Sequence, residues 1–148
     1  MILHFPEVRI APLSCVMVDG SFDPLHEGHI QYFKEASGLG LPVLCNVAPD
    51  SWTVEKHPVL LEISRRARVL EAICYITFVL VGCESTHQAL EIVKPRFFAK
   101  GSDWLAKGGI PNVELDTCAA QGTEVVYLDT IFNSSTDLIR QIASSKDT

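Results

Sequence analysis

The chain has 148 residues and a net charge of −6, and 47% of its residues are hydrophobic while 20% are charged. This length can bury a sizeable core, so we expect one domain over 1–148, with 1–12 as an N-terminal extension. The acidic balance argues against a nucleic-acid partner, no apolar run reaches the roughly 20 residues of a membrane span, and the start does not resemble a secretory signal.

Apolar runs alternate with amphipathic helical patterns along the chain. In chain order the predicted elements are strand Cys15–Val18, helix His29–Ala36, strand Val43–Val47, helix Ile63–Ile73, strand Ile76–Val81, helix Ser85–Val93, strand Arg96–Ala99, helix Pro111–Ala120, strand Glu124–Leu128 and helix Ser135–Ala143. Continuously apolar strands are typical of a parallel sheet that is buried on both faces. The pattern therefore predicts an α/β fold: a Rossmann-like, doubly wound sheet of five parallel strands in a single domain.

The segment after the first predicted strand is the most informative. It reads G-S-F-D-P-L-H-E-G-H and ends at the start of a predicted helix, with histidines at His26 and His29. A helix N-terminus presents free N–H groups and the positive end of its dipole, and imidazoles there can hold phosphate oxygens at neutral pH. Two histidines bonded to backbone are the structural alternative. The position at a strand's carboxyl end, where doubly wound sheets bind ligands, favours phosphate chemistry.

This segment resembles the hallmark G-x-F-D-x-x-H-x-G-H of the cytidylyltransferase-like nucleotidyltransferases. The resemblance implies that His26 and His29 hold the triphosphate of a nucleotide and stabilise the transition state as pyrophosphate leaves. It also implies that Gly28 lets the nucleotide approach the helix start. The other residues expected to bind nucleotide here are Gly20, Ser21, Phe22 and Asp23. The Asp-Pro pair also suits a turn, so we expect Asp23 mainly to orient the loop.

Two later segments extend the resemblance. Ser134, Ser135 and Thr136 match the hydroxyl-rich segment that precedes the family's last helix and contacts the nucleotide, although Ser134 with Asp137 also reads as a helix cap. The segment F-A-K-G-S-D-W looks like the K-G-x-D-[WY] segment of the domain that makes nucleotide-activated heptose, and glycerol-phosphate cytidylyltransferases have a similar one. It makes Lys100 and Asp103 candidate nucleotide ligands, and it leaves open whether Trp104 stacks on a base or packs.

A third segment bears arginines. The resemblance suggests that Arg66 reaches the active site and that Lys56, from the preceding loop, contacts phosphate; an arginine-bearing helix is otherwise usually a solvated face. The chain departs from the family's usual charges at Cys74, Thr77 and Asp129.

The resemblance implies transfer of a nucleoside monophosphate from ATP or CTP to a phosphorylated acceptor, nearest the heptose-phosphate branch, with Mg²⁺ bound through the nucleotide phosphates. One alternative is a cytidylyltransferase acting on a polyol or amino-alcohol phosphate such as glycerol 3-phosphate. Another is an inactive nucleotide-binding module, which the missing charges motivate. The five cysteines show no C-x-x-C spacing, which suggests reduced thiols in a cytoplasmic protein. A homodimer is expected from the resemblance only.

Overall fold

All strands that the structure describes belong to one parallel sheet. The computed structural model describes residues 1–7, 14–129 and 135–146. Across the sheet the order is β1-β4-β3-β2-β5-β6. The strands are β1 (Ile2–His4), β2 (Val16–Gly20), β3 (Val43–Val47), β4 (Phe78–Val81), β5 (Phe97–Gly101) and β6 (Glu124–Leu128). The five predicted strands are confirmed, with shifts of a few residues at their ends.

The predicted strand count of five was wrong, because the segment expected to be an extension contributes β1. Ile2 pairs with Val79 in parallel register, and His4 pairs with Val81 at the edge of the sheet. This strand has only three residues, so it shows no hydrophobic period that sequence reading could detect. Its place depends on a strand more than 70 residues later in the chain.

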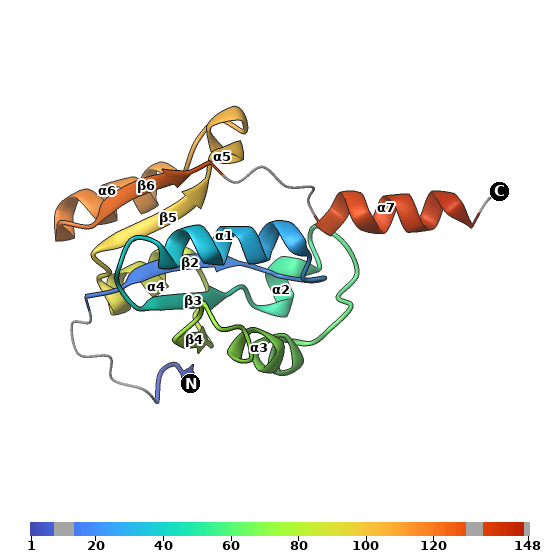
Figure 1. The fold of residues 1–148 in the computed structure, drawn as a ribbon, viewed down its shortest axis with the longest axis horizontal. Coiled ribbons are helices and arrows are strands. Elements are labelled where there is room, and N and C mark those ends of the chain that lie inside the picture. The colour runs from blue at the N-terminus through green and yellow to red at the C-terminus, as the bar shows by residue number, and fades with distance from the viewer. Residues whose placement is uncertain (8–13, 130–134, 147–148) are drawn as a thin grey trace.

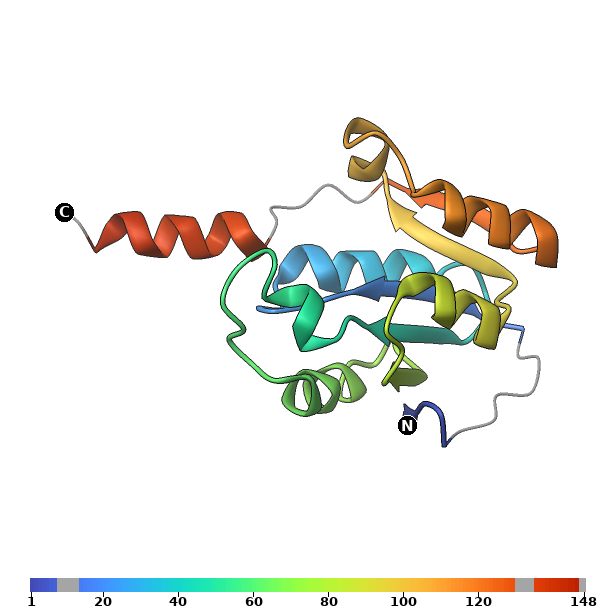
Figure 2. The ribbon, with the colours of Figure 1, turned by 180° about the vertical axis from the view of Figure 1, so that it is seen from behind.

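Helices cover both faces of the sheet. In chain order they are α1 (Glu27–Ser37), α2 (Asp50–Thr53), α3 (Ile63–Glu71), α4 (Thr86–Val93), α5 (Asp103–Ala106), α6 (Asn112–Gln121) and α7 (Ser135–Ser145). The one-turn helices α2 and α5 were not predicted; the others were. Helices α1 and α3 pack on one face and α4 and α6 on the other, as the two opposite views show (Figures 1 and 2). Helix α7 projects away from these layers (Figure 1).

Each face of the sheet has its own hydrophobic core. Tyr32 and Phe33 of α1 pack with Val16 and Val18 on one side, and Met17 packs with Leu90 of α4 on the other. Four of the cysteines are buried and Cys74 is exposed, and all five are free thiols. No helix within the described ranges is long and apolar enough to cross a bilayer.

The connections place a crevice at the centre of the sheet. Strand β2 lies between β3 and β5, and α1 leaves β2 on one face while α4 and α6 lie on the other. At such a switch point the loops that follow neighbouring strands diverge, which leaves room for a ligand at the carboxyl ends. The loop that leads from β2 to the two histidines starts there.

Candidate functional site

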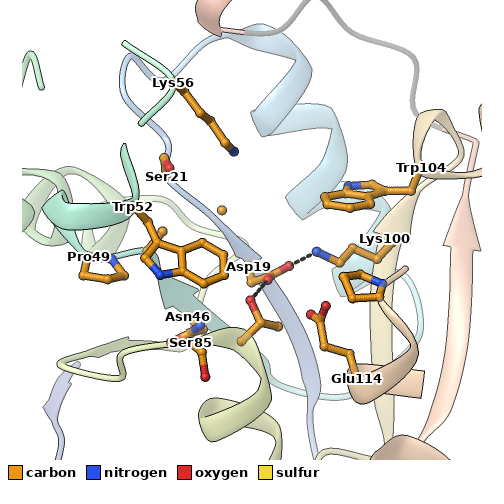
Figure 3. A pocket seen from close by; sticks show the side chains of 14 residues that line it. Asp19, Ser21, Asn46, Pro49, Trp52, Lys56, Ser85, Lys100, Trp104 and Glu114 are labelled. Atoms are coloured by element: carbon orange, nitrogen blue, oxygen red, sulfur yellow. Dashed lines mark hydrogen bonds and ion pairs between the residues drawn. The ribbon is translucent and has the colours of Figure 1, made fainter. Parts of the chain in front are cut away.

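A pocket opens at this switch point, above the carboxyl ends of β2, β3 and β5 (Figure 3). Its cavity volume is about 130 Å³, and it is partly open to solvent. Trp52 and Trp104 stand at opposite sides of it, and Lys56 reaches toward it from the loop after α2 (Figure 3). Its lining residues are Asp19, Gly20, Ser21, Asn46, Ala48, Pro49, Trp52, Lys56, Ser85, Thr86, Lys100, Trp104, Pro111 and Glu114.

The two histidines cap the first turn of α1 by bonding to its backbone. His26 is the N-cap residue, and its Nδ1 accepts a hydrogen bond from Gly28 N at 3.1 Å. His29 Nδ1 in turn accepts from His26 N at 3.3 Å, so the imidazoles form a reciprocal capping box. The rings stack with their centroids 3.7 Å apart. Capping of the helix backbone and binding of phosphate by the histidines are therefore compatible, because the cap uses only one nitrogen of each ring.

The capping geometry fixes the chemical character of both imidazoles. Each Nδ1 accepts a hydrogen bond, so in the neutral ring the hydrogen is on Nε2. Burial and, to a smaller extent, the neighbouring His26 together lower the pKa of His29 to about 3. Burial also lowers the pKa of His26, against the opposing effect of Glu27. At neutral pH both imidazoles are thus uncharged and carry their hydrogen on Nε2, beside a helix N-terminus of the kind that binds phosphate oxygens.

Phe22 connects the histidines to the pocket. Its backbone has a positive φ of 53°, and its buried ring meets His29 edge-on, with centroids 5.0 Å apart. The ring also covers Gly20, where a Cβ atom would lie only 3.0 Å from it. The structure therefore places Gly20 at the pocket wall and Phe22 beneath it as a support for His29.

Asp23 and Arg66 hold the loops around the site. Asp23 is fully buried and accepts hydrogen bonds from Leu60 N at 2.8 Å and Leu61 N at 2.9 Å. This agrees with its expected role in orienting the loop.

Arg66 is 1% exposed and donates to three carbonyls, those of Ser21, Ala48 and Leu61, while its Nη2 pairs with Asp50. The structure therefore places Arg66 behind the pocket wall, as a clamp between loops, and not among the pocket-lining residues.

Lys100 lies on the pocket floor in a chain of polar contacts. Its Nζ donates to Asp19 Oδ1, and Thr86 Oγ1 donates to Asp19 Oδ2 at 2.6 Å. The Lys100 ammonium also lies 4.3 Å from the centre of the Trp104 ring, so the indole contacts a cation and at the same time lines the pocket. Asp103 begins α5 and pairs with Lys107 at 3.0 Å, outside the pocket lining.

Some of the predicted nucleotide-binding residues cannot be placed in the structure. Ser134 lies outside the described residues, as do the side chains of Ser135 and Thr136, whose backbone begins α7. Their expected contact with the nucleotide stays a prediction. The Mg²⁺ prediction also stays one. Within the described ranges no three acidic, His or Cys side chains gather in a way that could hold a metal.

Sequence reading missed several pocket residues, among them Asp19, Thr86 and Glu114. Asp19 had a signal, because it is a charged residue at the end of an apolar strand just before the glycine motif. Thr86 and Glu114 had none, since each sits in the first turn of a helix where hydroxyl and acidic residues are common for local reasons. Glu114 is 7% exposed, and burial, followed by the neighbouring Asp19, raises its pKa.

Comparison with known proteins gives relatives over most of the chain. The family model described as "Cytidylyltransferase-like" matches residues 17–142. The bifunctional protein HldE of Citrifermentans bemidjiense is 31% identical over 136 residues, and that of Pseudomonas syringae is 32% identical over 143 residues. These alignments cover 88% and 94% of this chain but only 27% and 30% of the relatives, so the chain spans under a third of their length.

Two solved structures resemble the fold. A lipopolysaccharide core biosynthesis protein from Thermoplasma volcanium matches with a TM-score of 0.68 and 25% identity, covering 81% of this chain and 99% of that one. A pantoate-beta-alanine ligase from Francisella tularensis matches with a TM-score of 0.55 at 12% identity, covering 92% of this chain and 70% of that one. The second similarity concerns the fold alone.

Proposed function

Because the chain belongs to the cytidylyltransferase-like family, we propose that it transfers a nucleoside monophosphate from ATP or CTP to a sugar phosphate and releases pyrophosphate. The observation that carries this proposal is the pair of neutral imidazoles capping α1, next to a pocket at the switch point of the sheet. A phosphate oxygen of the acceptor attacks the α-phosphorus, and the bond from that phosphorus to the pyrophosphate oxygen breaks. No covalent intermediate with the protein is needed.

The residues of the chain supply binding and charge stabilisation for this step. Negative charge builds on the α-phosphoryl oxygens and on the leaving pyrophosphate, and donors already in place lower the barrier because they need no reorganisation. His26 and His29 cap α1 beside this pocket and carry their hydrogen on Nε2, while Lys56 lines the pocket itself as a cation. Mg²⁺, held through the nucleotide phosphates, would offset their charge.

The sugar phosphate acceptor rests on similarity. The segment from Phe98 to Trp104 resembles the heptose-phosphate branch, and one structural neighbour is named for lipopolysaccharide core biosynthesis. A heptose 1-phosphate is therefore the acceptor to test first. Glycerol 3-phosphate and phosphoethanolamine represent the alternative acceptors.

The test is release of pyrophosphate with Mg²⁺ and each of four nucleoside triphosphates against these acceptors. His29→Asn keeps an acceptor near Nδ1 for the cap but removes the Nε2 donor, so we expect kcat to fall roughly 100- to 1,000-fold. His29→Gln places an amide donor near Nε2 and should keep more activity. Exposed His4 on β1 offers a matched control, His4→Asn.

Full turnover by folded His29→Asn would contradict the mechanism. Saturable nucleotide binding by the wild-type chain, without pyrophosphate release for any acceptor, would instead support the non-catalytic alternative.

A further inference from the structure

Glu114 is a buried carboxylate whose side chain faces the pocket. It lies in the first turn of α6, is 7% exposed, and points toward the pocket floor beside Lys100 and Asp19 (Figure 3). Among the residues that the structure describes, no hydrogen bond or ion pair engages its carboxylate, whereas both oxygens of Asp19 are engaged by Lys100 and Thr86. Of these two pocket carboxylates, Glu114 is thus the one whose oxygens can accept hydrogen bonds from a ligand.

A carboxylate in this position is costly to the folded protein. Burial disfavours its charged form, and the nearby Asp19 adds repulsion. A carboxylate that has no partner within the described chain and faces a pocket open to solvent takes its hydrogen bonds from water or from a bound ligand. The ligand that enters the pocket should therefore bring a hydrogen-bond donor to Glu114.

The surroundings favour a neutral donor over a cation. An incoming ammonium group would meet the Lys100 ammonium, which already pairs with Asp19 on the pocket floor. The face of Trp104 that could hold a quaternary ammonium is also in contact with Lys100 Nζ. A hydroxyl group meets no such repulsion, and the half-exposed indole of Trp52 across the pocket offers an apolar surface for a sugar ring.

We propose that Glu114 is a specificity residue that accepts hydrogen bonds from the hydroxyl groups of a sugar ring in the substrate. This inference rests on the proposed function and deepens it, because it selects sugars over amino-alcohols. Two parts of the reaction carry such a ring: the acceptor sugar phosphate and the ribose of the nucleotide. The chemistry at Glu114 is the same for both.

Binding measurements separate these sources without depending on turnover. Wild-type protein, Glu114→Leu and Glu114→Gln are titrated with the α,β-methylene analogues of ATP and CTP and their 2′-deoxy and 3′-deoxy forms. Heptose 1-phosphate and phosphoethanolamine are then titrated with the ribonucleotide analogue bound. Exposed Asp116 on the same helix gives the matched control, Asp116→Leu.

We expect Glu114→Leu to weaken binding of one hydroxyl-bearing ligand by roughly 10- to 100-fold, the loss typical of a hydrogen bond to a charged group, and Glu114→Gln to weaken it less. If Glu114→Leu loses affinity for the sugar phosphate, then Glu114 contacts the sugar ring of the acceptor. If Glu114→Leu binds the ribonucleotide analogue only as tightly as a deoxy analogue, then Glu114 contacts the ribose of the nucleotide. We also expect a higher melting temperature for Glu114→Leu without ligand, because it removes a carboxylate whose charged form is disfavoured by partial burial and by Asp19. A purely structural role would lower that temperature.

Three results would overturn the inference: unchanged affinities in folded Glu114→Leu, selective loss of phosphoethanolamine binding, or wild-type protein that binds neither a ribonucleotide nor the sugar phosphate. Failure of the proposed function looks different. Wild-type protein would then release no pyrophosphate, while the binding arms still report whether Glu114 contacts a hydroxyl-bearing ring.

Discussion

The buried imidazole of His29 should make the stability of the fold fall between pH 7 and pH 5. Its pKa is about 3 in the folded chain, against 6.5 for an ordinary histidine. As the pH falls below 6.5, the unfolded chain binds a proton that the folded chain does not. The free energy of unfolding therefore falls with pH through the window from 6.5 down to 3.

The size of the effect follows from these two values. Between pH 7 and pH 5 the unfolded imidazole goes from largely neutral to almost fully charged, which weights the unfolded state about 25-fold more, or about 2 kcal/mol. His29→Asn removes this group and keeps a side-chain acceptor for the N–H of His26. We expect the variant to lose about 2 kcal/mol less stability than wild type over the same pH interval.

Urea unfolding at pH 7 and pH 5 measures both losses, and the groups common to the two proteins cancel in the difference. The exposed imidazole of His4 provides a control, because His4→Asn should leave the wild-type pH dependence in place. Equal losses in wild type and His29→Asn would show that the imidazole is not held neutral, and the account of His29 as an uncharged Nε2–H donor would fail with it.

Three further predictions concern the stability of the fold, each measured by urea unfolding. Asp23→Ala should cost about 3 kcal/mol, because two buried N–H groups lose a charged acceptor. Gly82→Ala should lower the free energy of unfolding by about 3 kcal/mol, because its Cβ would lie 2.4 Å from the backbone oxygen of Phe5, just after β1. Gly40 also has a positive φ, but no atom lies near its would-be Cβ, so Gly40→Ala should lower the free energy of unfolding by only about 1 kcal/mol. Arg66→Lys should lower the free energy of unfolding by about 2 kcal/mol, because an ammonium cannot reproduce the guanidinium's contacts with several loops. The control, exposed Arg65→Lys, should change the free energy of unfolding by less than about 0.5 kcal/mol.

Particular results would contradict each of these. A near-neutral Asp23→Ala would mean that the loop after α2 finds other acceptors. Equal losses of unfolding free energy in Gly82→Ala and Gly40→Ala would contradict the steric clash expected at Gly82. Matching effects at the two arginines would mean that the clamp does not stabilise the fold.

Local sequence determined the order of elements and the motif that contains the two histidines. The apolar runs and helical periods encode most strands and helices because these patterns depend only on neighbours within a few residues. The motif that ends at His29 is likewise continuous, so it could be recognised as nucleotidyltransferase-like, and the family match supports that prediction. The cytoplasmic location, the homodimer and the Mg²⁺ requirement stay predictions.

Tertiary structure decided which side chains share the pocket and what each does there. Lys100 meets Asp19 from 81 positions away, and Glu114 reaches the same floor from a helix on the opposite face to α1. Arg66 was predicted at the active site, but the structure uses its donors to join loops. Periodicity tells which residues face the sheet, not which loops the strand order brings together, because that order is set by pairing between strands distant in the chain.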